Sequence, residues 1–379
     1  MRITHVDVTP VSIPIDPSRA IRGSRGYHDR STYLILEVQT DEGLVGLGEV
    51  SCTAVWSGED HVMARQVVEA YLVPTLVGQD PLQIETRTRE MRRAVAGSPF
   101  VIAGLEVALW DLLGKACGQP IYRLLGGPVR DRIETKFSIS GLEPERAAAI
   151  ASWAAESGFP SMKVKVGFGA EVDEARVRAV REAIGPDVKL GIDANGGWSP
   201  REAIATLGRL AAYDIAFAEQ PVAPDDPAWM ADVRANVGVP VLADESVFGL
   251  RDAAAVVRSR AADMLSIYVG KGGGIGTAVK IAHLAEGFGV ACTIGSNLEM
   301  GIATAAQIHL GLALPAVRPE AIACDILSPV LYQGSVLDQP LPIVPGEARA
   351  PAGPSGLGVS LDRERLRRFA IADTATLTA

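Results

Sequence analysis

Three carboxylates and a pair of lysines stand at regular intervals in the middle of the chain. Asp193, Glu219 and Asp244 each end a short apolar run, and they recur at intervals of about 25 residues, roughly one βα unit. Lys163 and Lys165 form a Lys-x-Lys pair in the run before them. Three carboxylates that meet at one place cannot all stay ionised without a cation. Oxygen ligands in this number suit Mg²⁺, with Mn²⁺ as the alternative, so the spacing predicts a divalent-metal site beside two lysines.

The elements that must position these groups are strands of a parallel sheet. Apolar runs alternate with helical patterns such as 175–184 and 200–212, which is typical of successive βα units. The four runs cover residues 161–166, 191–195, 217–221 and 242–246. Their charges fall at the carboxyl ends of the strands, where barrel enzymes keep their chemistry. The alternative is three unrelated helix N-caps, since Asp is common there, but three in consecutive units make that interpretation the weaker one.

On these motifs the chain resembles the mandelate racemase and muconate lactonizing enzyme family of the enolase superfamily, in its muconate lactonizing subgroup. The matching motifs are Lys-x-Lys, Asp-x-Asn at Asp193, Glu-Gln-Pro at Glu219 and Ala-Asp-Glu-Ser around Asp244. Ala-Leu-Trp-Asp at 108–111 and Leu-Leu-Gly-Gly at 124–127 extend the resemblance over nearly the whole chain. It implies an α/β fold, a modified TIM-type (β/α)7β barrel with an α+β capping domain.

The resemblance also implies how the domains divide the chain. Residues 1–127 are expected to form the capping domain, residues 128–340 the barrel, and residues 341–379 a segment that returns to the capping domain. In the first part, alternating side chains and a turn predict an antiparallel meander over residues 3–13, 33–40 and 44–50. Helical patterns follow over 61–73, from Asp80-Pro81 to about residue 95, and over 99–118. The remaining barrel strands are expected at 135–140, 263–269, 290–296 and 321–327.

The family reaction begins with removal of a proton from the carbon next to a carboxylate, and Mg²⁺ stabilises the resulting enolate. Lys165 is the candidate base, and Lys163 beside it would help to lower its pKa. The family usually carries a second lysine on the sixth strand, where this chain has Tyr268. Lys271 matches a later lysine without a general catalytic role, and its offset of three predicts that it points away from the face of Tyr268 unless the backbone turns first.

The missing lysine leaves three functional hypotheses open. With Lys165 as the only lysine base, a cycloisomerase or a lyase that eliminates water in syn geometry is the first choice. A racemase or epimerase, in which Tyr268 or Lys271 supplies the second proton, is the alternative. A protein that binds metal but has lost catalysis is the third. A tyrosine with its ordinary pKa near 10 is a poor base, which is why the one-base hypothesis comes first.

Further residues receive roles through the same resemblance. Glu299, at the end of the seventh expected strand, is a candidate for orienting the substrate or a proton. Asn195, Gln220 and Glu245 are expected to support the metal ligands from behind. Contacts with an anionic substrate are expected from two lid loops and the eighth strand end, namely Arg22, Arg25, Tyr27, Trp56 and Asp325. The substrate is therefore expected to be a small-molecule carboxylate, and the enzyme a homo-oligomer.

Composition excludes several classes of function. The 379 residues carry a net charge of −9 and no block of basic residues, so nucleic acid is not an expected partner. No apolar run is long enough to span a bilayer, so no membrane partner is expected. The chain opens without the layout of a signal peptide, and its four cysteines lack metal-like spacing. We therefore expect reduced thiols and a cytoplasmic location.

Overall fold

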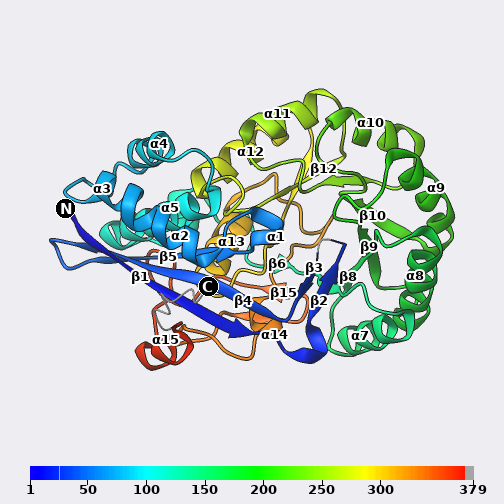
Figure 1. The fold of residues 1–379 in the computed structure, drawn as a ribbon, viewed down its shortest axis with the longest axis horizontal. Coiled ribbons are helices and arrows are strands. Elements are labelled where there is room, and N and C mark those ends of the chain that lie inside the picture. The colour runs from blue at the N-terminus through cyan, green and yellow to red at the C-terminus, as the bar shows by residue number, and fades with distance from the viewer. Residues whose placement is uncertain (25, 372–379) are drawn as a thin grey trace, which may run out of the picture.

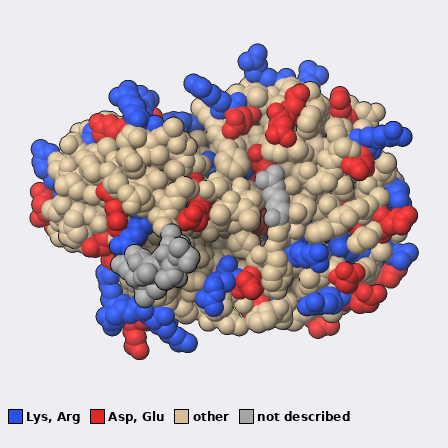
Figure 2. All heavy atoms as spheres, in the orientation of Figure 1, with Lys and Arg blue, Asp and Glu red and all other residues tan. Residues whose placement is uncertain are grey.

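The computed structural model describes residues 1–24 and 26–371. An N-terminal α+β part lies beside a larger barrel whose helices form an outer arc (Figure 1). The C-terminal segment runs back to the N-terminal part, where α15 lies below β1 in this view. The described residues contain no helix that is both long enough and apolar enough to cross a membrane. On the face shown in Figure 2, basic and acidic side chains are interspersed.

The N-terminal sheet is the predicted antiparallel meander. Its strands β1 (Ile3–Pro14), β4 (Arg30–Thr40) and β5 (Val45–Cys52) pair in the order β1-β4-β5. Helix α5 (Pro99–Cys117) packs directly on β5. A Cβ atom at Gly46 or Gly48 would lie 2.2 or 2.0 Å from a carbonyl oxygen of α5, so only glycine allows this close approach.

Short helices complete the N-terminal part. They are α1 (Ala54–Ser57), α2 (His61–Val67), the π-helical turn η2 (Val68–Leu72), α3 (Val73–Leu76), α4 (Ile84–Ala94) and α6 (Ile121–Leu124). The prediction that Asp80-Pro81 opens a helix was wrong by a few residues. The Asp80 carboxylate instead accepts a hydrogen bond from the Leu82 backbone in a turn, and α4 begins only at Ile84.

The barrel sheet has seven parallel strands in sequential order. They are β7 (Phe137–Ile139), β8 (Ser161–Lys165), β9 (Lys189–Asp193), β10 (Ile215–Glu219), β11 (Val241–Ala243), β12 (Met264–Ile267) and β13 (Ala291–Ile294). The helices between and after them are α7 (Pro144–Glu156), α8 (Ala170–Ile184), α9 (Pro200–Leu210), α10 (Pro227–Asn236), α11 (Leu250–Arg258), α12 (Ile275–Gly287) and α13 (Ile302–Ala313), with a 3-10 turn η3 (Ala211–Tyr213) after α9. The predicted α/β barrel is therefore confirmed.

The expected eighth strand is much shorter than predicted. Within 321–327 only Cys324 forms a bridge, which is parallel and pairs it with Thr135. The Cys324 amide donates to the Glu134 carbonyl at 2.8 Å, and the Asp325 amide donates to the Ile294 carbonyl at 2.8 Å. These two bonds join the segment to the chain just before the first barrel strand and to the end of the seventh, so the segment closes the barrel without forming a regular strand.

The C-terminal segment contacts both parts of the molecule. After α14 (Ser328–Leu331), its strands β14 (Ile343–Val344) and β15 (Glu347–Ala348) form a small sheet with β6 (Ile133–Glu134). The Leu357 amide then donates to the buried Asp111 carboxylate of α5 at 2.8 Å. In α15 (Arg363–Phe369), Arg363 donates two bonds of 2.6 Å to Glu37 of β4. These contacts support the proposal that the segment from residue 341 returns to the capping domain as far as residue 371, whereas residues 372–379 lie outside the described residues.

Two buried carboxylates fix the N-terminal part over the barrel. Glu106 of α5 accepts bonds of 2.8 Å from the first two amides of α12, and Glu49 of β5 accepts from the Met300 and Ile302 amides at the start of α13. Each satisfies amides that a helix leaves unpaired at its N-terminus. Burial raises the pKa of both carboxyl groups to about 7.

Candidate active site

A pocket opens at the carboxyl ends of the barrel strands. Lys165, Asp193 and Glu219 are the last residues of β8, β9 and β10, and Asp244 directly follows β11. These side chains and Lys163 line the pocket, as do Asn195, Tyr268 and Asp325. Its cover comes from the N-terminal part, through a hairpin of β2 (Ile21–Gly23) and β3 (Gly26–His28) and through α1. Before the hairpin the chain makes a 3-10 turn, η1 (Pro17–Arg19).

The hairpin is bonded to the barrel mouth. The Arg22 amide donates to Ser140 Oγ at 2.7 Å, and the Arg22 carbonyl accepts from the Gly141 amide at 2.7 Å. Ser24 Oγ donates to the Ala194 carbonyl at 2.9 Å, next to the end of β9. Because these bonds join the hairpin to two strand ends, its inner face is held over the pocket.

Each predicted metal ligand is paired with at least one lysine ammonium group. Lys165 Nζ lies 2.6 Å from Asp193 Oδ2, Lys163 Nζ lies 2.8 Å from Glu219 Oε1, and Lys271 Nζ lies 2.5 Å from Asp244 Oδ1. All three carboxylates are at most 2% exposed. The pairing offsets the cost of burying their negative charges.

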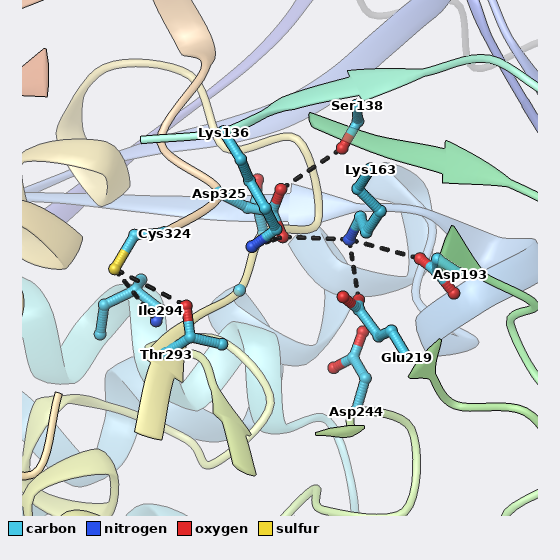
Figure 3. A network of polar contacts seen from close by, with 12 residues as sticks. Lys136, Ser138, Lys163, Asp193, Glu219, Asp244, Thr293, Ile294, Cys324 and Asp325 are labelled. Atoms are coloured by element: carbon cyan, nitrogen blue, oxygen red, sulfur yellow. Dashed lines mark hydrogen bonds and ion pairs between the residues drawn. The ribbon is translucent and has the colours of Figure 1, made fainter. Parts of the chain in front are cut away.

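Lys163 is the centre of a wider ionic network. Figure 3 shows its ammonium group between Asp325, Asp193 and Glu219, at 3.0, 3.3 and 2.8 Å. Lys136, which is fully buried, contacts the same Asp325 oxygen at 3.0 Å. Burial alone would lower the pKa of Lys163, but the three carboxylates outweigh it and hold the pKa well above its ordinary value. Lys163 is therefore a fixed cation.

The donor set fits Mg²⁺. The oxygens are hard carboxylate ligands from three successive strand ends, as this ion prefers. Glu219 Oε2 is buried and has no hydrogen-bond partner among the described residues. Burial and the nearby charges of Asp193 and Asp244 outweigh the Lys163 ammonium group and raise the pKa of Glu219 well above its ordinary value, so a further cation would favour its ionised form. Within residues 1–24 and 26–371, however, no three acidic, Cys or His side chains already converge on one point.

The three residues predicted to support the metal ligands lie around them. Asn195 accepts from Lys165 Nζ at 2.9 Å, and its backbone amide donates to Asp193 Oδ1 at 2.9 Å. Its side-chain amide also donates to Glu245 at 3.0 Å. Gln220 Oε1 accepts from the Asp244 amide at 3.0 Å. Asn195 and Gln220 adopt left-handed backbone conformations, with φ of 46° and 35°, which turn the chain sharply at these strand ends.

Lys271 shows the exception to its expected direction, because the backbone turns before it. Strand β12 ends at Ile267 and the chain turns at once, so Lys271 returns to the same side as Tyr268 and lies 4.0 Å from its ring centroid. The Tyr268 hydroxyl donates to Asp244 Oδ2 at 2.8 Å, whereas Lys271 binds the other carboxylate oxygen, Oδ1. Burial, followed by the charge of Asp244, raises the pKa of Tyr268 well above its ordinary value. Tyr268 is therefore a protonated phenol whose hydroxyl is bonded to Asp244.

The predicted substrate contacts divide into two groups. Trp56 lines the pocket and stacks on Tyr268, with centroids 5.6 Å apart and an interplanar angle of 9°. Arg22 and Tyr27 pair with each other across the hairpin and project from its outer face, where they line a separate hollow. The structure thus does not support a role for them as contacts in this pocket. Arg25 lies outside the described residues.

Glu299 lies behind the pocket wall. Its carboxylate accepts from Ser296 Oγ at 2.6 Å and from the Asn297 amide at 3.1 Å, and burial raises its pKa. It therefore holds the loop after β13, and the lining residues are its neighbours Ser296, Asn297 and Leu298.

Three residues of the site were missed in the sequence. Lys136 directly precedes the first barrel strand and belongs to no motif, and Asn297 stands in a loop whose shape the sequence does not reveal. His28 was visible only as one polar residue in a lid loop, although its pairing with Ile21 puts it on the inner face of the hairpin. An alternation of faces within residues 21–28 was the one signal that could have identified it.

Comparisons with known proteins agree with this geometry. The family model "Mandelate racemase / muconate lactonizing enzyme, N-terminal domain" matches residues 3–126, and "Enolase C-terminal domain-like" matches residues 145–365. The chain is 32% identical to a chloromuconate cycloisomerase of Pseudomonas putida, over 97% of this chain and 99% of that one. It is 35% identical to an L-Ala-D/L-Glu epimerase of Clostridium acetobutylicum, over 83% and 87%. The crystal structure of a dipeptide epimerase from Enterococcus faecalis V583, complexed with Mg and the dipeptide L-Leu-L-Tyr, superposes with a TM-score of 0.90 at 31% identity, covering 95% and 99%.

Proposed function

The chain belongs to the mandelate racemase and muconate lactonizing enzyme family of the enolase superfamily, and on that premise we propose that it is a Mg²⁺-dependent enzyme that removes the α-proton of a carboxylate substrate. One observation carries this proposal. The Lys165 ammonium group lies in the pocket, 2.6 Å from the first of three buried carboxylates at successive strand ends. The Mg²⁺ that accompanies the dipeptide in the related epimerase structure is additional support.

Asp193, Glu219 and Asp244 would hold the ion. Bound there, Mg²⁺ would stabilise electrostatically the negative charge that develops on the substrate carboxylate as the α-proton leaves. Lys165 in its neutral form accepts that proton at Nζ, and Asn195 orients the amine through the 2.9 Å contact with its side-chain oxygen. Lys163 stays protonated and adds a fixed positive charge beside the developing negative charge.

We propose a one-base reaction, either cycloisomerisation or syn elimination of water from a hydroxy acid. Racemisation needs an acid and a base on opposite faces of the α-carbon. The position of the family's second lysine is taken by Tyr268, whose hydroxyl is bonded to Asp244 and whose ring is stacked between Trp56 and Lys271. The Tyr268 hydroxyl and the Lys271 ammonium group are both bonded to Asp244, which argues against either as the second acid–base group.

The alternative function is a racemase or epimerase. It is favoured by the similarity to epimerases, which is as extensive as the similarity to cycloisomerases. In that case the Tyr268 phenol would have to deliver the second proton. A metal-binding protein without catalysis is the third candidate, and α-proton exchange in D₂O would exclude it.

The stereochemistry of exchange tests the choice between one base and two. We expect Tyr268→Phe to retain α-proton exchange within about tenfold of wild type, because a positioned acid or base is worth about 10²–10⁴-fold and the ring is expected only to shape the pocket. Incubation of an enantiopure substrate in D₂O, followed by NMR and chiral chromatography, measures both exchange and inversion. Deuterium should return to the face it came from. Inverted product that disappears in Tyr268→Phe would instead establish the epimerase.

Two further expectations carry over from the sequence. We propose a homo-oligomer, by analogy with the family, and sedimentation velocity at micromolar concentration should show a species larger than 39.9 kDa. A monomer under those conditions would contradict it. A cytoplasmic location also stays a prediction.

A further inference from the structure

Two residues that line the pocket each carry a buried polar atom without a hydrogen-bond partner among the described residues. His28 Nδ1 and Asn297 Nδ2 are inaccessible to solvent, and neither has a hydrogen-bond partner among the described residues. They come from different parts of the molecule, the hairpin cover and the loop after β13, yet both residues line the same pocket. Nearly all buried polar groups in folded proteins are hydrogen-bonded. Two exceptions on one pocket wall therefore indicate groups whose hydrogen-bond partner is a bound ligand.

The backbone around Asn297 is fixed in advance. Its amide donates to the Glu299 carboxylate at 3.1 Å. The next residue, Leu298, has a left-handed φ of 57°, and its carbonyl accepts hydrogen bonds from Tyr33 at 2.5 Å and from Tyr332 at 2.6 Å. The side-chain amide of Asn297 is therefore presented by a rigid loop, as a binding group should be.

His28 is held from the other side. Its pairing with Ile21 places it on the inner face of the hairpin, and the hairpin is bonded to the ends of two barrel strands. Burial lowers the pKa of His28, which keeps the imidazole neutral near pH 7. A neutral imidazole can donate or accept, and a side-chain amide nitrogen donates.

The rest of this wall is uncharged. Ile21, Val55, Leu298 and Leu327 line the pocket as apolar side chains. Of the described lining residues, Lys163 and Lys165 are the lysines, and both ammonium groups are already bonded to carboxylates. Among the described residues, this wall thus offers hydrogen bonds without offering a counter-charge for a second anionic group.

We propose that His28 and Asn297 form a subsite for an uncharged oxygen-bearing substituent of the substrate, an amide or a hydroxyl. This inference rests on the proposed function, which places the substrate carboxylate at the metal end of the pocket. The substrate class is then a monocarboxylate with an apolar body and a neutral hydrogen-bonding group, and a dicarboxylate is disfavoured. Of the two proposed one-base reactions, the subsite therefore favours syn elimination of water over a cycloisomerisation that needs a second carboxylate.

Calorimetry on the Mg²⁺-loaded full chain tests the subsite without requiring turnover. The probes are matched carboxylates that differ at one end, namely succinamate, 4-hydroxybutyrate, pentanoate and succinate, together with the same series one methylene longer. We expect the amide or the hydroxyl to bind about 3–10-fold more tightly than the methyl analogue, which is the value of one net hydrogen bond, and succinate to bind no more tightly than pentanoate. Comparison of the first two probes tells an amide subsite from a hydroxyl subsite.

Variants assign the preference to the two side chains. His28→Phe and Asn297→Leu should each reduce it, whereas Tyr27→Phe, on the outer face of the same hairpin, should leave it unchanged. Four outcomes would each overturn the subsite. Wild type could bind all probes equally, bind the dicarboxylate most tightly, or bind no probe at all. The preference could also survive in both variants.

α-Proton exchange in D₂O, measured on the same samples, separates the two proposals. A binding preference without exchange of any probe would count against the proposed chemistry and leave the subsite standing. Exchange of a probe without any binding preference among the probes would count against the subsite and leave the proposed chemistry standing.

Discussion

Replacement of Lys165 with methionine is expected to reduce α-proton exchange by about 10²–10⁴-fold, the contribution of a positioned acid–base group. Methionine keeps the length of the side chain but cannot accept the proton. The loss should appear in kcat far more than in KM, because the substrate carboxylate is held by other groups. Exchange is followed by NMR in D₂O on any carboxylate that wild-type protein exchanges.

Lys280→Met is the matched control. Lys280 is 48% exposed, contacts Glu85 on the outside of the molecule at 2.8 Å, and should leave exchange unchanged when removed. Exchange that persists in Lys165→Met within threefold of wild type would remove Lys165 from the mechanism. Lys163→Met is not an equivalent test, since it would leave the buried Asp193, Glu219 and Asp325 without their shared counter-charge.

The sequence predicted the barrel and the convergence of its charged residues for a physical reason. Successive βα units place strand ends side by side, so carboxylates at the ends of three such strands must lie at one edge of the sheet whatever the loops do. Asp193 and Glu219 indeed end adjacent strands, with the two residues in register. The metal that would join them is still a proposal.

The sequence did not predict what depends on the path of the chain between elements. Lys271 was placed by counting alternation beyond Ile267, but β12 ends there and the turn reverses the direction of the side chain. Arg22 was predicted as a substrate contact because of its charge. The register of the two-strand hairpin, however, decides which of its residues face the pocket, and Arg22 is not one of them. Such registers depend on contacts like the bond from the Arg22 amide to Ser140, which joins residues 118 positions apart.

Replacement of Glu219 with glutamine is expected to abolish the stabilisation of the protein by Mg²⁺. A ligand at 100 times its Kd raises the free energy of unfolding by about 2.7 kcal/mol, so saturating Mg²⁺ should raise the melting temperature of wild-type protein by several degrees. Glutamine removes one anionic ligand and leaves a neutral amide at a site built for carboxylate oxygens, which weakens Mg²⁺ binding. The same variant should lose α-proton exchange.

Two measurements together test this prediction: the melting temperature at increasing Mg²⁺ concentration, and calorimetric titration of the protein with the ion. Without Mg²⁺ the variant is expected to be no less stable than wild type, because burial and neighbouring carboxylates already raise the pKa of Glu219 and a neutral amide removes that repulsion. Glu320→Gln, at an exposed position, should respond to Mg²⁺ as wild type does. Equal Mg²⁺ stabilisation of wild type and Glu219→Gln would place the ion elsewhere. If wild type is not stabilised and calorimetry detects no binding, the three carboxylates are not a metal site and their lysine partners alone neutralise them.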